Sequence, residues 1–143
     1  MHELVVTSPD EISTLQIADK LARQLKGGEL IELVGDLGSG KTTFVKGLAK
    51  GLGSKDPVSS PSFVLKNTYD GRLRLNHFDL YRLSDPGLIK HEIKDALDEK
   101  DSVTAVEWAG ATGEVLPEKR IIIELIPQKD DKRRIKISYR GAQ

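Results

Sequence analysis

Gly35 to Phe44 reads GDLGSGKTTF and combines three glycines with a lysine and two threonines. It satisfies the pattern G-x-x-x-x-G-K-[ST]. Glycines let the backbone wrap closely and aim successive N–H groups inward, which makes an anion site at the positive end of the helix that follows. Lys41 could reach phosphate oxygens, and the Thr42 hydroxyl could bind Mg²⁺. A turn without a ligand would explain the glycines but not the Lys-Thr pair, so the segment predicts a nucleoside triphosphate site.

Mg²⁺ needs further oxygen ligands, and two carboxylates follow apolar strand-like segments. Glu107 lies in TAVEW and Asp79 in LNHFDLYRL. Either could hold the ion directly, hold it through water, or polarise an attacking water. His77 could be a ligand, but a lone histidine beside an apolar strand is more often structural. Trp108, the single tryptophan, is either a core residue or faces a nucleotide or a partner.

Hydrophobic periodicity and turn residues indicate the elements that carry these groups. We expect helices at 8–25, 41–53 and 85–100, and strands at 2–7, 29–34, 102–108, 119–126 and 133–140, with a hairpin at 61–83 around Asp70-Gly71. The first helix is expected to be capped by Ser8, with Pro9 in its first turn, Glu11 completing a capping box and Ile12 on its apolar stripe. Helices and strands alternate before antiparallel strands, which predicts an α/β fold with a mixed sheet.

Composition excludes several classes of protein. The 143 residues predict one domain spanning 1–143, and 22 basic residues balance 22 acidic ones. The chain therefore has no net positive charge that would attract it to nucleic acid. The basic run Lys129–Arg140 is interpreted as a solvated hairpin. The absence of cysteine excludes disulfides, thiol catalysis and cysteine-ligated zinc. No signal peptide or membrane-spanning run is evident, so we expect a cytoplasmic protein without a membrane partner.

Five segments follow one another along the chain: PDEISTLQIADKLA, GDLGSGKTTFVKGL, SSPSFVL, HFDLYRL and VEWAGATGEVLP. In this order they resemble the TsaE (YjeE) family, the bacterial ATPases of tRNA threonylcarbamoyladenosine (t6A) biosynthesis. The phosphate loop is common to many families, whereas HFDLYRL followed by VEW is specific to this one. The resemblance implies a phosphate-loop NTPase-like three-layer fold, with a mixed, mostly parallel sheet, some antiparallel strands and flanking helices.

The resemblance also implies ATP and Mg²⁺ as cofactors and assigns site residues. Thr42 and Glu107 would hold the metal, and Asp79 would assist the metal or hydrolysis. Ser62, where the family usually has threonine, would belong to a switch-like loop near the γ-phosphate. The remaining nucleotide contacts would come from the phosphate loop, the start of the first helix and the strand-end tryptophan, namely Asp10, Gly38, Ser39, Gly40, Lys41, Thr42, Thr43 and Trp108.

Family members bind a pair of related proteins, TsaB and TsaD, and their ATP turnover supports that complex, with tRNA involved only indirectly. We therefore expect an accessory ATPase that is slow alone and stimulated by its partners. The alternative is a small-molecule kinase with the same phosphate loop, although its lid would contain a single arginine, Arg82. A GTPase is disfavoured because no Asn-Lys-x-Asp signature is present. A nucleotide-gated interaction module is the third class considered.

Overall fold

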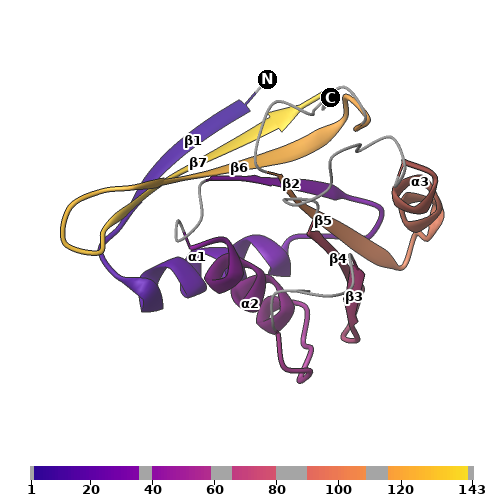
Figure 1. Cartoon of the computed structure of the whole chain (residues 1–143). Coiled ribbons are helices and arrows are strands. Elements are labelled where there is room, and N and C mark those ends of the chain that lie inside the picture. Colours follow the sequence, from indigo (N-terminus) through magenta and orange to yellow (C-terminus); the bar gives the residue numbers. More distant parts are fainter. Residues whose placement is uncertain (1, 36–39, 59–65, 80–89, 109–115, 142–143) are drawn as a thin grey trace.

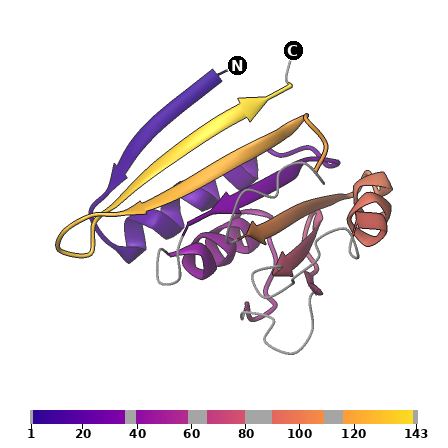
Figure 2. The same ribbon diagram turned by 45° about the horizontal axis from the view of Figure 1, so that its top comes forward.

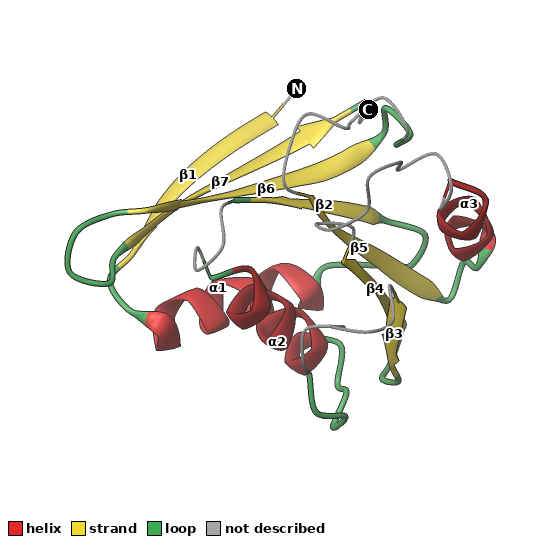
Figure 3. Cartoon of the chain, viewed as in Figure 1, coloured by secondary structure: helices red, strands yellow, loops and turns green. Residues whose placement is uncertain are grey.

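The computed structural model describes residues 2–35, 40–58, 66–79, 90–108 and 116–141. These ranges contain seven strands and three helices (Figure 3). In chain order they are β1 His2–Ser8, α1 Glu11–Arg23, β2 Leu30–Val34, α2 Lys41–Gly51, β3 Lys66–Tyr69, β4 Arg74–Asp79, α3 Lys90–Asp98, β5 Ser102–Trp108, β6 Arg120–Pro127 and β7 Arg133–Arg140. The expected residues 85–89 of the third helix lie outside the described ranges.

All strands join one sheet in the order β1-β7-β6-β2-β5-β4-β3. The central pairs β6–β2, β2–β5 and β5–β4 are parallel, whereas β1–β7, β7–β6 and β4–β3 are antiparallel. The expected α/β fold with a mixed sheet is therefore confirmed, with its parallel strands in the middle. Both chain ends lie at the same end of the β1–β7 edge (Figures 1 and 2).

Helices cover both faces of the sheet because its central strands are apolar on both sides. Helices α1 and α2 lie side by side against one face, where Ile31, Leu33 and Ala105 belong to the larger core (Figure 1). The alternate residues of the same strands, such as Leu30 and Val106, form a second core with residues of α3. In a strand, successive side chains point to opposite faces, so the two cores lie on opposite sides of the sheet. No helix in the described ranges is long and apolar enough to cross a membrane.

Small residues hold α1 and α2 close together. A Cβ added at Gly47 would lie 2.4 Å from the Leu15 carbonyl oxygen and 2.5 Å from the Ala18 Cβ. One turn later, a Cβ on Gly51 would lie 2.6 Å from the Ala22 Cβ. Glycines and alanines four residues apart thus share one face of each helix, and the two backbones approach through them. Because of this contact, the first turn of α1 lies next to the first turn of α2.

The start of α1 differs from the expectation. Asp10 caps the helix, because its Oδ1 accepts a hydrogen bond from the Ser13 backbone N–H at 2.7 Å. Ser8 is the last residue of β1, and its hydroxyl donates to the Asp10 carbonyl oxygen at 2.7 Å, so it is not the cap. Ile12 is 69% exposed, so it is not part of the buried face of α1, which includes Ala18, Leu21 and Ala22. The sequence prediction was wrong at both residues.

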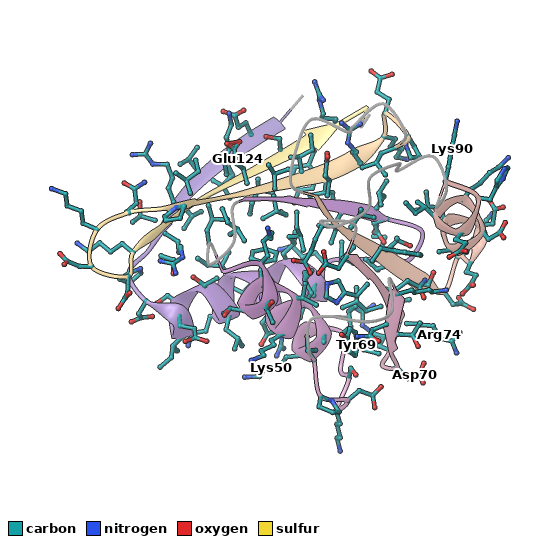
Figure 4. All side chains as sticks on the ribbon, in the orientation of Figure 1. Lys50, Tyr69, Asp70, Arg74, Lys90 and Glu124 are labelled. Carbon is teal, nitrogen blue, oxygen red and sulfur yellow. The ribbon has the colours of Figure 1, made fainter. Side chains whose placement is uncertain are left out.

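The hairpin around Asp70-Gly71 is confirmed for β3 and β4, whereas the expected residues 61–65 and 80–83 lie outside the described ranges. Asp70 and Arg74 pair at 3.0 Å across the turn (Figure 4). Gly71 is not among the residues with positive φ. Instead, a Cβ there would lie 2.4 Å from the Leu52 carbonyl oxygen, so the residue permits close contact with the end of α2. Next to Gly71, the Arg72 guanidinium donates hydrogen bonds to two carbonyl oxygens at the C-terminal end of α1, those of Ala22 and Leu25.

Candidate nucleotide-binding site

The phosphate-loop motif joins β2 to α2, as expected. Gly40 precedes the first residue of α2 in the left-handed conformation, with φ of +102°, which glycine adopts without strain. The first helical hydrogen bond runs from the Phe44 N–H to the Gly40 carbonyl oxygen at 2.9 Å. Gly38 and Ser39 lie outside the described residues. The N-terminus of α2, whose N–H groups and dipole favour an anion, therefore lies directly after this turn.

Lys41 points back toward the end of β2. Its Nζ donates to the Gly35 carbonyl oxygen at 2.5 Å, and the residue is only 7% exposed. An ammonium buried to this degree requires nearby oxygen atoms, because burial without partners is costly. The side chain thus reaches from the first residue of α2 to the end of β2, and its charge lies at the carboxyl-terminal edge of the central strands.

The two predicted carboxylates lie at the same edge. Glu107 of β5 is the register partner of both Leu33 in β2 and Asp79 in β4. Neighbouring parallel strands carry register partners on the same face, so Glu107 and Asp79 lie beside each other on the α2 side of the sheet. In open α/β sheets ligands bind at the carboxyl ends of the strands. The structure therefore brings the phosphate loop and both carboxylates to one place.

Two further residues hold Glu107. The His77 Nε2 is hydrogen-bonded to the Glu107 Oε2, and the Tyr69 hydroxyl is 3.3 Å from the His77 Nδ1. His77 is fully buried, and Tyr69 and Glu107 are each 3% exposed. A structural role for His77 was expected, but its hydrogen bond to the neighbouring strand was not predicted. The signal that was available is the spacing of His77 and Asp79, which puts both on one face of a strand.

The donor set suits Mg²⁺. Among the described residues, no group of three or more His, Cys, Asp or Glu side chains could hold a metal by itself. Mg²⁺ is usually bound by one or two protein oxygens together with substrate phosphates and water. Thr42, next to Lys41, supplies a hydroxyl at the N-terminus of α2, and Glu107 supplies a carboxylate at the neighbouring strand end. These residues therefore fit the ion chemically.

The start of α1 lies beside the same helix. The Thr43 hydroxyl donates to the Glu11 Oε1 at 3.2 Å, which joins the first turn of α2 to that of α1. Asp10, predicted to lie near the adenine, uses one carboxylate oxygen to cap α1. Trp108 pairs with Val34 in the sheet. The side chain of Trp108 and all of Ser62 and Arg82 are outside the described residues.

One cation near the loop was not predicted. A Cβ added at Gly40 would lie 3.4 Å from the Nε of Arg133, the first residue of β7. The Arg133 Nη1 also donates to the Lys132 carbonyl oxygen at 3.1 Å, which directs the guanidinium. The solvated-hairpin interpretation of Lys129–Arg140 therefore misses this residue. Its only signal in the sequence is a basic run, which does not distinguish Arg133 from its neighbours.

The motif between the parallel strand β2 and helix α2, whose Lys41 donates to the Gly35 carbonyl oxygen, is that of the phosphate-loop α/β proteins that bind nucleotides. The profile of the family described as "Threonylcarbamoyl adenosine biosynthesis protein TsaE" matches residues 8–135. The chain belongs to the TsaE family of t6A biosynthesis proteins.

Individual relatives agree with this assignment. The chain is 42% identical to the tRNA threonylcarbamoyladenosine biosynthesis protein TsaE of Bacillus subtilis, covering 94% of this chain and 83% of the relative. It is 37% identical to the protein of that name from Aquifex aeolicus, covering 96% of each chain. The crystal structure of Bacillus subtilis YdiB superposes with a TM-score of 0.79 at 34% identity, covering 98% of this chain and 87% of that one.

Proposed function

We propose that this chain is a single-domain ATPase that binds ATP with Mg²⁺, hydrolyses it, and thereby supports threonylcarbamoyl modification of tRNA. The observation that carries the proposal is the contact of the Lys41 ammonium with the Gly35 carbonyl oxygen. It puts the cation at the sheet edge where Glu107 and Asp79 are register partners. Family membership supports the place in t6A biosynthesis.

Binding follows from charge and hydrogen bonding at the loop. The N–H groups of Gly38, Ser39, Gly40 and Thr43 would surround the phosphates, and Lys41 would neutralise part of their charge. Thr42 and Glu107 would hold Mg²⁺, which when bound neutralises charge on the phosphate oxygens. Asp10 and Trp108 would contact the nucleoside.

Arg133 extends this binding set. Its guanidinium lies beside Gly40, which precedes the lysine of the loop. Arginine binds phosphate through a rigid fork of N–H donors and stays charged at all ordinary pH values. We assign Arg133 a contact with the bound nucleotide, as a second cation from the distant β6–β7 hairpin.

Hydrolysis requires an oriented water molecule. Its oxygen forms a bond with the γ-phosphorus while the bond from that phosphorus to the bridging oxygen of ADP breaks, and the proton of the water leaves to solvent. Asp79, next to Glu107, would orient this water or the outer ligands of the metal. Ser62 would contribute its hydroxyl near the γ-phosphate. The partners in this proposal are a TsaB–TsaD-like pair, with tRNA contacted only through them.

The test compares two lysines of α2. Lys41→Ala removes the cation at the loop, so ATP affinity or steady-state phosphate release should fall by about a hundredfold. Lys50→Ala, an exposed lysine on the same helix (Figure 4), should leave both near the wild-type values. Binding is measured by calorimetry and release without any phosphate acceptor, which separates hydrolysis from kinase activity. Wild-type binding by folded Lys41→Ala would contradict the proposal.

A further inference from the structure

A buried hydrogen-bonded chain runs across three neighbouring strands of the sheet. It consists of Tyr69 in β3, His77 in β4 and Glu107 in β5, three strands that are neighbours in the sheet. The Tyr69 hydroxyl lies 3.3 Å from the His77 Nδ1, and the His77 Nε2 is hydrogen-bonded to the Glu107 Oε2. All three residues are at most 3% exposed. Water does not compete for these contacts in such an environment, so each one restrains its partner strongly.

The chemistry of the three groups decides which atoms donate. The Glu107 carboxylate can only accept, so the proton of this contact is on the His77 Nε2. In the neutral imidazole the Nδ1 is then an acceptor, and the Tyr69 hydroxyl donates to it. The chain of donors therefore runs from Tyr69 through His77 to Glu107. This order fixes the tautomer and the ring orientation of His77, as the partners of a histidine usually do.

The arrangement restrains one oxygen of Glu107. Within the part of the chain that the structure describes, the hydrogen bond from His77 is the one found on this carboxylate. The Oε2 is held on the side of β4, and rotation of the carboxylate would break a buried hydrogen bond. The Oε1 then keeps one orientation at the sheet edge where the phosphate loop begins. A carboxylate with one oxygen held and the other available is suited to bind a metal through a single oxygen.

We propose that His77, itself oriented by Tyr69, is a positioning residue that holds the Glu107 carboxylate ready for Mg²⁺. This inference rests on the proposed function, in which Glu107 is a metal ligand. His77 does not bind the metal itself, because the nitrogen nearest to the site already donates to Glu107. A purely structural His77 would stabilise the sheet edge without influencing metal affinity. The two roles therefore differ in a measurable quantity.

Two amide variants of His77 separate these roles. The side-chain nitrogen of glutamine reaches about as far as the histidine Nε2, whereas that of asparagine reaches only the position of Nδ1. His77→Gln should keep the bond to Glu107 and bind Mn²⁺, in the presence of ADP, within about threefold of the wild type. His77→Asn should bind Mn²⁺ about tenfold or more weakly, the usual effect of losing a group that orients a metal ligand. Free Mn²⁺ is measured by electron paramagnetic resonance.

Metal-free ADP binding is measured on the same proteins and should change by less than about threefold, since the chain acts on the metal ligand. Equal Mn²⁺ affinities for the glutamine and asparagine variants would overturn the proposal. If either His77 variant fails to fold, Tyr69→Phe decides, because it removes only the hydroxyl. It should weaken Mn²⁺ binding by several-fold, and an affinity equal to the wild type would then overturn the proposal.

Glu107→Ala distinguishes this failure from a failure of the proposed function. If Glu107→Ala binds Mn²⁺ and ADP as the wild type does, Glu107 is not a metal ligand and both proposals fall. If Glu107→Ala loses Mn²⁺ while the His77 and Tyr69 variants retain it, the ATPase proposal stands and the positioning role is rejected.

Discussion

At the scale of single residues, two cations that belong to different elements lie next to the phosphate-loop motif, namely Lys41 and Arg133. Lys41 comes from the helix that the loop starts, and Arg133 comes from a hairpin at the other end of the chain. The Lys41 Nζ donates to the Gly35 carbonyl oxygen at the end of β2. Arg133 lies beside Gly40 and directs its guanidinium with a bond to the Lys132 carbonyl oxygen. The nucleotide would therefore be held from two sides.

We predict that Arg133→Ala weakens ATP binding by about tenfold, because a hydrogen bond to a charged group contributes about 1.5 kcal/mol or more. Arg134→Ala is the matched control, since Arg134 is the adjacent arginine and is exposed. Calorimetric titration with ATP at constant ionic strength measures both. Equal losses in the two variants would show that only the overall charge of the hairpin matters.

At the scale of elements, the contact of α1 with α2 depends on having no side chain at Gly47. Helix propensity alone predicts that Gly47→Ala stabilises α2 by roughly 1 kcal/mol. The added Cβ would instead lie 2.4 Å from the Leu15 carbonyl oxygen, and that backbone can move only with its helix. We predict a net loss of about 1–3 kcal/mol in the free energy of unfolding, as for other overpacked sites.

Urea unfolding measures this change. Lys46→Ala, at the exposed neighbouring position of the same helix, should change stability by no more than about 0.5 kcal/mol. An increase in stability for Gly47→Ala would mean that the helices separate without cost. Their separation would also break the bond between Thr43 and Glu11, so ATP affinity is a second readout.

The cap of α1 makes stability depend on pH. The backbone N–H of Ser13, followed by its hydroxyl, holds the pKa of Asp10 below its ordinary value of 3.8. The folded pKa is lower than the unfolded one, so the charged carboxylate stabilises the fold above the unfolded pKa. This contribution is lost as the pH falls through the folded pKa.

We predict that the wild type is more stable than Asp10→Asn at pH 7 and that the difference shrinks as the pH falls below about 4. Asparagine can still cap the helix, so the comparison isolates the charge. Unfolding midpoints without nucleotide at pH 7 and pH 3 measure it. A difference of the same size at both values would show that the charge of Asp10 does not contribute.

At the scale of the whole molecule, catalysis is expected to depend on partners. The described residues place two cations at the ends of the phosphate-loop motif, Lys41 and Arg133, and both are proposed to bind the nucleotide. A further cation that acts only in the transition state, such as an arginine finger, raises phosphoryl-transfer rates by about a thousandfold or more where it operates. We expect the TsaB–TsaD-like pair to supply such a cation, or to order the site so that hydrolysis becomes faster.

We therefore predict slow phosphate release by the purified chain and a rise of about tenfold or more when the partner pair is added. Steady-state release is measured with and without the pair. Lys41→Ala with the pair present is the control for ATPase activity in the added proteins. Fast hydrolysis by the chain alone, unchanged by the partners, would contradict the prediction.

Some of this molecule follows from the sequence by itself. The phosphate loop is contiguous, so the glycines, Lys41 and Thr42 lie together whatever the rest of the chain does. The hairpins and the helix of the loop also depend on neighbours within a few residues. Alternation of apolar side chains then indicated an α/β fold with a mixed sheet. These features need only local geometry, which the order of residues determines.

Local sequence patterns did not determine where α1 begins or why the β3–β4 turn needs a glycine. Ser8, Pro9 and Glu11 looked like a helix start, but Asp10 competes for the same role and wins because Ser8 continues β1. The Asp-Gly turn was found, yet the reason for Gly71 is its contact with α2 rather than its own backbone conformation. In each case a residue distant in the chain is responsible, because Ser8 pairs with Arg133 of β7 and Gly71 contacts Leu52.

Only the tertiary structure decided which distant residues meet. His77 and Glu107 are 30 residues apart, and their bond depends on β4 and β5 being neighbours in the observed register. Arg133 reaches Gly40 because β7 begins near the loop, and Gly47 is required because α1 crosses α2 there. A shift of one residue in a strand would turn every side chain to the other face of the sheet. Strand order and register result from packing the whole core, and no single segment of the sequence specifies them.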